Sequence, residues 1–301
     1  MTDDEQPVAS SGGPSPWVLN VSVAVLCLIW GSTWLVIKEG LRDLPPLTSA
    51  ATRFLAAGVL FIPLTAALRG REGGVSPGWR LSTIMAVFCF AVPYGTLYWV
   101  ETRIPSGLAS VLWALFPMAL ALIGSRVLAD QQLSGRNWFG FILGFAGVAV
   151  LFVTDLRTIG AEAVGAGLIY LSSPIVAAYG NAVVKRDAGQ VSSLALNRNG
   201  LLGGSVLLWL TAWITEADAP IQWTNAAIAS VVYLTLIGTV LAFGLYFWLL
   251  RYAKAHKLAL IAYVVPALAL LLGWGLGDES LGSSTVAGTA LILLGVRWVV
   301  R

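Results

Sequence analysis

Long apolar runs dominate the sequence, and short breaks rich in turn-forming and charged residues separate them. Most runs approach the length of about 17–25 residues that an α-helix needs to cross a bilayer. The breaks hold groups such as Arg42-Asp43-Leu44-Pro45-Pro46, which disfavour a continuing helix. The pattern predicts ten transmembrane helices over residues 17–37, 46–68, 81–101, 104–125, 137–153, 163–184, 194–215, 226–250, 256–276 and 284–300.

The composition supports a membrane fold. Hydrophobic residues make up 57% of the 301 residues and charged residues only 11%, and the mean hydropathy is +0.81. A soluble domain carries about 25% charged residues. Because the runs do not alternate polar and apolar residues, a transmembrane β-barrel is not expected. We therefore expect an all-α integral membrane protein with the lipid bilayer as its main solvent.

Lysine and arginine residues are distributed unevenly between the breaks. If the N-terminus is cytoplasmic, twelve of the eighteen lie in inner breaks and four in outer breaks, while Arg53 and Arg198 lie within helices. Cytoplasmic loops retain these residues, so the bias predicts that both termini are cytoplasmic. The net charge of +3 does not predict a nucleic-acid partner, because in a membrane protein the placement of charge matters more than its sum.

The two halves of the chain match each other. A shift of 149 residues places Tyr98-Trp99 on Phe247-Trp248 and Pro117 on Pro266. Each half holds five predicted helices, an odd number, so equivalent helices must cross the membrane in opposite directions. We therefore expect two inverted five-helix repeats. The predicted divisions are a disordered tail over residues 1–16, a first repeat over 17–153 and a second repeat over 154–301.

Inverted repeats predict transport. Two homologous halves that exchange conformations can expose one mid-membrane site to each side in turn, and such repeats recur among transporters. The alternatives are a static scaffold and a lipid-modifying membrane enzyme. An enzyme of that kind needs clustered His, Asp, Glu or Ser groups or a metal, and no such cluster is evident. We therefore expect a secondary transporter and not an enzyme.

Several short features follow one another in a recognisable order. They are Ile29-Trp30-Gly31-Ser32-Thr33-Trp34, Arg53-Phe54, Pro117 and Pro266, and glycine-rich stretches at Gly140-Phe141, Gly147-Val148, Gly288 and Gly295-Val296. Together they resemble the ten-helix EamA branch of the drug/metabolite transporter superfamily over almost the whole chain after Pro16. The resemblance implies a central cavity lined by helices one, three, four, six, eight and nine.

The resemblance also implies a function and a location. It implies export of small metabolites, with neutral or aromatic amino acids as the nearest class, across a prokaryotic plasma (inner) membrane. A multidrug transporter or a transporter of other metabolites, such as nucleosides or sugar derivatives, is the alternative. The expected partners are a small-molecule substrate and the bilayer, and the protein is expected as a monomer or a homodimer.

Polar and aromatic residues within the presumed cavity helices are the candidate substrate-binding residues, because hydrocarbon penalises unpaired polar groups and so turns them inward. The candidates are Trp30, Ser32, Thr33, Tyr94, Tyr98, Trp113, Tyr179, Asn181, Arg198, Tyr246 and Tyr263. Together they would form a wet, aromatic-walled pocket for an ammonium or carboxylate and an apolar side chain. Anchoring at the membrane interface is the alternative for the Trp and Tyr residues.

The two arginines within helices, Arg53 and Arg198, occupy similar positions early in helices two and seven. Each could attract a substrate carboxylate or form a gate contact, and each could instead extend to the nearby interface. Asn197 and Asn199 add hydrogen-bonding capacity beside Arg198. For this reason Arg198 enters the predicted site and Arg53 does not.

The remaining candidates concern gating and coupling. Pro117 and Pro266 are predicted as gate or hinge residues, because proline within a helix removes an amide donor and kinks the backbone. With His256 as the single histidine, no metal site or cofactor is expected. Glu101 is the only carboxylate close to a helix interior, so a facilitator or exchanger is favoured, while proton coupling through Glu101 stays open.

Overall fold

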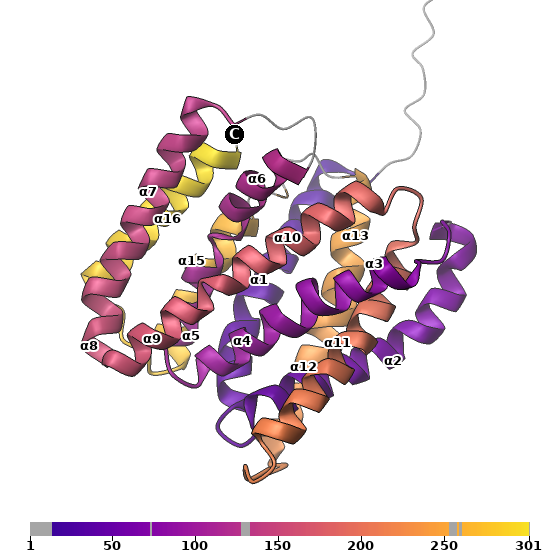
Figure 1. Ribbon diagram of the computed structural model, residues 1–301, viewed down its shortest axis with the longest axis horizontal. Helices are drawn as coiled ribbons and strands as arrows, with labels where there is room; N and C mark the ends of the chain where they lie inside the picture. Colours follow the sequence, from indigo (N-terminus) through magenta and orange to yellow (C-terminus); the bar gives the residue numbers. More distant parts are fainter. Residues whose placement is uncertain (1–13, 73, 128–132, 253–257, 259–260, 301) are drawn as a thin grey trace, which may run out of the picture.

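The computed structural model describes residues 14–72, 74–127, 133–252, 258 and 261–300, which are helical over most of their length (Figure 1). The helices are α1 (Pro16–Gly40), α2 (Pro46–Glu72), α3 (Trp79–Ile84), α4 (Val92–Glu101), α5 (Ser106–Trp113), α6 (Phe116–Val127), α7 (Gly135–Leu151), α8 (Arg157–Ile159), α9 (Ala161–Tyr170), α10 (Ser172–Asp187), α11 (Ser193–Thr215), α12 (Asn225–Thr235), α13 (Ala242–Tyr252), α15 (Ile261–Leu276) and α16 (Ser283–Val300). Three π-helical segments, η1 (Met85–Ala91), η2 (Phe152–Leu156) and η3 (Leu236–Leu241), extend these helices.

Consecutive segments join into ten spans within the described ranges. The composite spans are α3-η1-α4, α5-α6, α7-η2-α8, α9-α10 and α12-η3-α13. By length and composition, seven helices among the described residues can cross a membrane, namely 16–40, 46–68, 79–101, 106–127, 135–159, 161–187 and 225–246. The helices α15 and α16 are apolar but shorter, and α11 is as long as the others but includes Asn197-Arg198-Asn199. The predicted membrane fold of about ten helices is confirmed.

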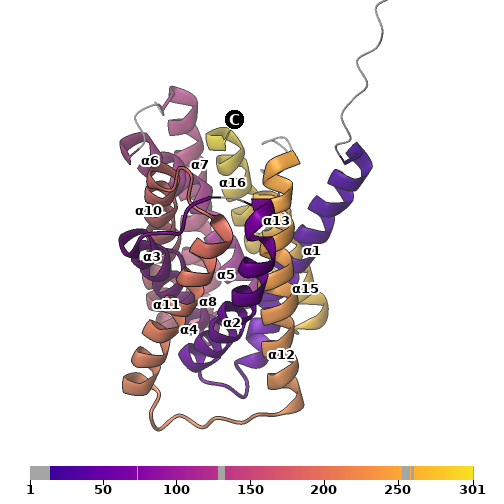
Figure 2. The same ribbon diagram turned by 90° about the vertical axis from the view of Figure 1, so that its right-hand side faces the viewer.

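The packing of the spans follows an approximate two-fold symmetry. The most extensive contacts join α7 with α16 and α2 with α11, which are the fifth with the tenth span and the second with the seventh (Figures 1 and 2). The contact of α1 with α15 is matched by that of α10 with α6, which is its equivalent when the halves are exchanged. Since each half contributes five crossings, equivalent spans run in opposite directions, and the predicted inverted repeat is confirmed.

Glycines allow the fifth and tenth spans to pack closely. A Cβ atom at Gly140 would lie 2.7 Å from the carbonyl oxygen of Gly295, and one at Gly147 would lie 2.6 Å from that of Gly288. Small residues let two helix backbones approach each other in lipid, where no hydrophobic effect drives them together. The glycine-rich stretches of the two repeats therefore serve helix packing.

The N-terminal prediction is only partly covered by the structure. Most of the predicted tail, residues 1–13, lies outside the described residues, as does His256. Helix α1 begins at Pro16, and the hydroxyl of Ser15 accepts a hydrogen bond from the backbone N–H of Val18 at 3.4 Å. Proline in the first turn of a helix is favourable because its missing N–H has no partner there.

Candidate functional site

Arg53 of α2 lies buried where the two halves meet. The residue is only 4% exposed. Its Nε donates a hydrogen bond to Thr239 Oγ1 in η3 at 3.0 Å, and its Nη1 donates to the hydroxyl of Tyr98 in α4 at 3.1 Å. One side chain therefore connects two helices of the first repeat with the π-helical segment of the second.

The positive charge of Arg53 has no counter-ion within the described ranges. The ion pairs found there join Arg42 with Glu39, Arg103 with Glu162, and Arg186 with Asp187. A guanidinium has five N–H donors, and Arg53 uses two of them in hydrogen bonds to the described residues. A buried charge without a partner is costly, so an anionic group brought to this position would be stabilised.

Aromatic rings surround the guanidinium of Arg53. Its Cζ atom lies 5.5 Å from the ring centroid of Phe54 and 5.6 Å from that of Tyr94, within the range of cation–π attraction. The ring of Tyr94 packs against Phe54 at 4.8 Å and, more loosely, against Trp113 at 6.5 Å. These rings form an apolar wall beside a fixed positive charge.

A second group of rings continues this wall into the other half. Trp30 packs against Tyr246 at 5.5 Å and against Phe243 at 6.2 Å, and Phe243 contacts Phe90 at 6.3 Å. We call the combined set the central cluster. Its members are Trp30, Arg53, Phe54, Phe90, Tyr94, Tyr98, Trp113, Thr239, Phe243 and Tyr246.

The central cluster includes five of the predicted substrate-binding residues, namely Trp30, Tyr94, Tyr98, Trp113 and Tyr246. Three further candidates have other surroundings. Thr33 is buried beside Gly238, where an added Cβ atom would lie 2.9 Å from Thr33 Cγ2 and 3.6 Å from Arg53 Nη2. The hydroxyl of Ser32 shares a hydrogen bond of 2.7 Å with that of Tyr233 in α12. Tyr263 of α15 is half-buried against the main hydrophobic core.

Tyr179, Asn181 and Arg198, the other predicted residues, do not join the cluster. Tyr179 of α10 is 44% exposed and packs on Phe88, and Asn181 on the same helix is exposed as well. Arg198 is half-buried, and its Nε and Nη2 both donate to Asn199 Oδ1, at 3.1 and 2.9 Å. Their role in substrate binding stays a prediction.

The two predicted hinge prolines lie in different backbone settings. Pro117 is the second residue of α6, directly after the break that separates α5 from α6. Pro266 lies buried inside the continuous helix α15. A more symmetric irregularity is found in spans three and eight, because the shift that relates the two halves places η1 on η3. Such π-helical segments are rare and often occur at functional sites.

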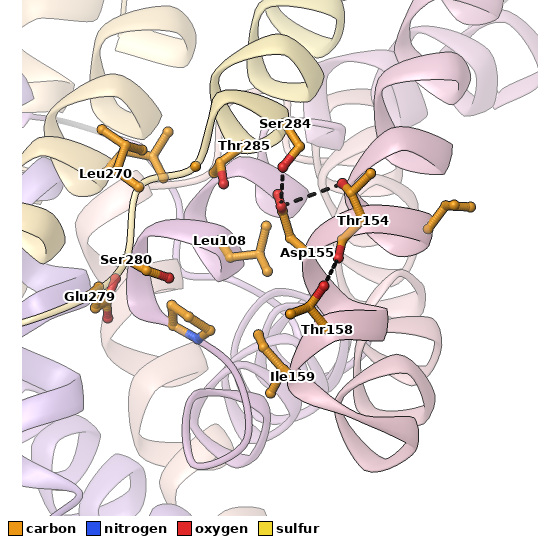
Figure 3. A pocket seen from close by; sticks show the side chains of 14 residues that line it. Leu108, Thr154, Asp155, Thr158, Ile159, Leu270, Glu279, Ser280, Ser284 and Thr285 are labelled. Carbon is orange, nitrogen blue, oxygen red and sulfur yellow. Dashed lines mark hydrogen bonds between the residues drawn. The ribbon is translucent and has the colours of Figure 1, made fainter.

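A pocket of about 610 Å³ lies at one end of the bundle, between α5, η2, α8 and the segment that precedes α16 (Figure 3). Asp155 Oδ1 accepts hydrogen bonds from Ser284 at 2.6 Å and from Thr154 at 3.4 Å, while its Oδ2 is buried without a partner among the described residues. Glu279 lines the same pocket. The volume of the pocket suits a small ligand, and its mostly apolar lining carries two acidic side chains, Asp155 and Glu279, where the central cluster carries a cation.

Two carboxylates tie the halves together at this end. Glu279 accepts hydrogen bonds from the backbone N–H groups of Ser106 and Gly107, at 2.6 and 3.0 Å, at the start of α5. Glu216 accepts from those of Leu47 and Thr48, at 2.7 and 2.8 Å, at the start of α2. In both cases a carboxylate of the second repeat caps a helix N-terminus of the first, where the free N–H groups and the helix dipole favour a negative charge. We call this the capped end.

A helical membrane protein built from two inverted repeats has an architecture that recurs among transporters. The sequence profile of the EamA-like transporter family matches residues 17–153 and again residues 164–301. The chain therefore belongs to the EamA-like transporter family and is a small-molecule transporter.

Individual relatives agree with this assignment. The chain is 30% identical over 272 residues to the uncharacterized inner membrane transporter YedA of Escherichia coli K12, covering 90% of this chain and 87% of YedA. It is 26% identical to the uncharacterized transporter YoaV of Bacillus subtilis strain 168, covering 92% of this chain and 94% of YoaV. A crystal structure described only as that of a protein shares the fold, with a TM-score of 0.67 and 18% identity over 95% of this chain and 98% of that one.

Proposed function

We propose that this transporter exports small molecules that combine a carboxylate with an apolar or aromatic side chain, and that neutral or aromatic amino acids are its substrates. The observation that carries the proposal is the buried guanidinium of Arg53, which has no carboxylate partner among the described residues. A carboxylate fits this group because it can accept two parallel hydrogen bonds from a guanidinium. The surrounding rings of Phe54, Tyr94 and Trp113 suit an apolar side chain.

Arg53 also helps to separate the alternative substrates. A cationic drug would be repelled by a buried positive charge, so the charge disfavours a multidrug transporter of cations. Nucleosides and neutral sugar derivatives carry no anionic group that could neutralise Arg53. A substrate with a carboxylate is attracted by Arg53 and can neutralise its charge. An aromatic amino acid also fits against the rings of the central cluster.

Alternating access around the central cluster is the proposed mechanism. The carboxylate caps of Glu216 and Glu279 join the two halves at one end and must release before the cluster can open toward that side. The distribution of Lys and Arg supports an orientation with this capped end outside and both termini in the cytoplasm. The printed name of YedA supports a location in a prokaryotic inner membrane.

Counterflow in proteoliposomes tests the substrate class. Vesicles loaded with unlabelled phenylalanine are expected to accumulate labelled phenylalanine, tryptophan and leucine. Phenylalanine amide and phenethylamine keep the ring but lack the carboxylate, so they are expected to give no signal above protein-free vesicles. Equal counterflow of phenethylamine, or counterflow of cationic drugs or nucleosides alone, would overturn the proposal.

A further inference from the structure

Glu101, the last residue of α4, is a buried acid that the proposed transport site does not use. It is 0% exposed, and neither of its carboxylate oxygens has a hydrogen-bond partner within the described part of the chain. Tyr98, three residues earlier, lies on the same face of the helix, and its hydroxyl accepts a hydrogen bond from Arg53. Glu101 is therefore one helical turn away from a direct partner of the central arginine.

The groups that face Glu101 leave its carboxylate without a donor. Lys38 of α1 donates from Nζ to the backbone carbonyl of Glu101 and, at 2.9 Å, to that of Ile104, and not to the carboxylate. Tyr170 of α9 has a buried hydroxyl without a partner among the described residues. Lys38, Glu279 and Arg53 are the charged groups that interact electrostatically with Glu101.

A carboxylate in this position responds to the charge of its surroundings. An ionised carboxylate without donors is costly in a membrane interior, and the attraction of Lys38 and Arg53 offsets part of that cost. A substrate carboxylate bound to Arg53 would offset the attraction that the Arg53 charge exerts on the Glu101 carboxylate. Binding of the substrate at Arg53 and binding of a proton at Glu101 should therefore favour each other.

We propose that Glu101 is the proton-coupling site of this transporter, and that it takes up one proton when a substrate carboxylate binds Arg53. The inference rests on the proposed function, because it requires a substrate with a carboxylate. The proton comes from the solution on the side to which the site is open, and it converts the Glu101 carboxylate to the neutral acid. A zwitterionic amino acid then crosses the membrane together with one positive charge. Export therefore requires an outward substrate gradient large enough to exceed the inward proton gradient of a prokaryotic inner membrane.

Calorimetry on the purified full-length protein tests the coupling. Phenylalanine is titrated at each of several pH values in two buffers with different ionisation enthalpies, phosphate and Tris near neutral pH, and the difference in measured heat gives the number of protons taken up per substrate. We expect uptake of up to one proton by the unaltered protein. We also expect its affinity to fall as the pH rises, by up to tenfold per pH unit once Glu101 is ionised in the free protein.

Two variants assign the proton to its site. Glu101→Gln keeps the shape of the side chain and should bind phenylalanine with no proton uptake and no pH dependence. Glu162→Gln removes an exposed acid that pairs with Arg103 at the same end of the bundle, and it should behave like the unaltered protein. Uptake that persists in Glu101→Gln would overturn the proposal.

The calorimetry of the unaltered protein tests the proton coupling by itself, so the proposal can be tested even if a variant fails to fold. Phenylalanine binding with no proton uptake at any pH tested and with no dependence of affinity on pH would overturn the role of Glu101 and leave the proposed substrate class intact. Absence of binding for every carboxylate in the substrate panel would overturn both proposals.

Discussion

Arg53 and Arg198 both lie early in equivalent helices of the two repeats, α2 and α11, but their surroundings differ. Arg53 is buried and is held by Tyr98 of its own repeat and by Thr239 of the other. Arg198 is half-buried, and its guanidinium is bound by the adjacent residue Asn199. The Asn199 amide in turn donates to the hydroxyl of Ser82 in α3 at 3.1 Å.

The difference shows how a symmetric scaffold can hold an asymmetric site. The helices α2 and α11 occupy equivalent places in the two repeats and pack against each other. The two arginines differ in their partners, because the hydroxyls of Tyr98 and Thr239 hold Arg53 at the contact between the repeats. A site that lies close to a two-fold axis needs its charge from one half only, because two like charges there would repel each other.

The largest expected effect comes from removing each arginine in turn. Arg53→Gln should weaken phenylalanine binding about 10- to 100-fold, because a charge-assisted hydrogen bond contributes about 1.5–3 kcal/mol. Arg198→Gln should change the affinity by less than about twofold, since Arg198 interacts with its own neighbour. Titration calorimetry of the two variants measures the difference. A larger loss in Arg198→Gln would contradict the central role of Arg53 and support the substrate-binding role predicted for Arg198.

A smaller effect is expected at Tyr98. Tyr98→Phe keeps the buried ring and removes the hydroxyl that accepts from Arg53. The guanidinium would then be held by Thr239 alone, and we expect phenylalanine affinity to fall about fivefold, which corresponds to about 1 kcal/mol. Tyr179→Phe is the matched control, because that hydroxyl belongs to an exposed side chain. Equal losses in the two variants would contradict a specific role for Tyr98.

The smallest expected effect concerns the contact between the repeats. Thr239→Val has nearly the same shape but removes the acceptor for Arg53 Nε and the bond from Thr239 to the carbonyl of Leu234 at 2.8 Å. The apparent melting temperature in detergent should fall by about 2–4 °C. Thr211→Val removes only a hydroxyl bonded within its own exposed helix turn and should leave it unchanged. A melting temperature unaltered by Thr239→Val would show that this contact adds no stability.

The fold could be predicted from the sequence because lipid imposes a simple rule. The backbone N–H and C=O groups must form hydrogen bonds within each span, so every crossing requires a long apolar helix. Each such helix appears in the sequence as a long apolar run. The duplication could be recognised for a related reason, since matched residues such as Pro117 and Pro266 are separated by a nearly constant number of residues in the sequence. The break between α5 and α6 and the π-helical segments could not be predicted, because the apolar runs continue through them.

The site was less predictable because a helix in lipid is apolar on every side. In a soluble protein, alternating polar and apolar residues reveal which face of a helix is buried, but here lipid and protein both select apolar residues. The candidates were chosen only by their predicted position within the membrane helices. As a result Tyr179, which is exposed, and Tyr98, which is buried, entered the same predicted pocket. Phe54 and Phe90 were missed because they carry no polar atom. Arg198 was preferred to Arg53 because Asn197 and Asn199 lie beside it in the sequence, whereas Thr239, the partner of Arg53, lies far from it in the sequence.

The paired π-helical segments change how spans three and eight should be interpreted. A π turn holds one residue more than an α turn, so the residues beyond it are rotated by about 100° relative to an uninterrupted helix. A helical wheel drawn through residues 225–252 therefore loses its phase after η3 (Leu236–Leu241). Tyr246, which packs against Trp30, lies beyond this segment. The insertion or loss of one residue in η3 would therefore redirect every side chain of α13, Tyr246 included.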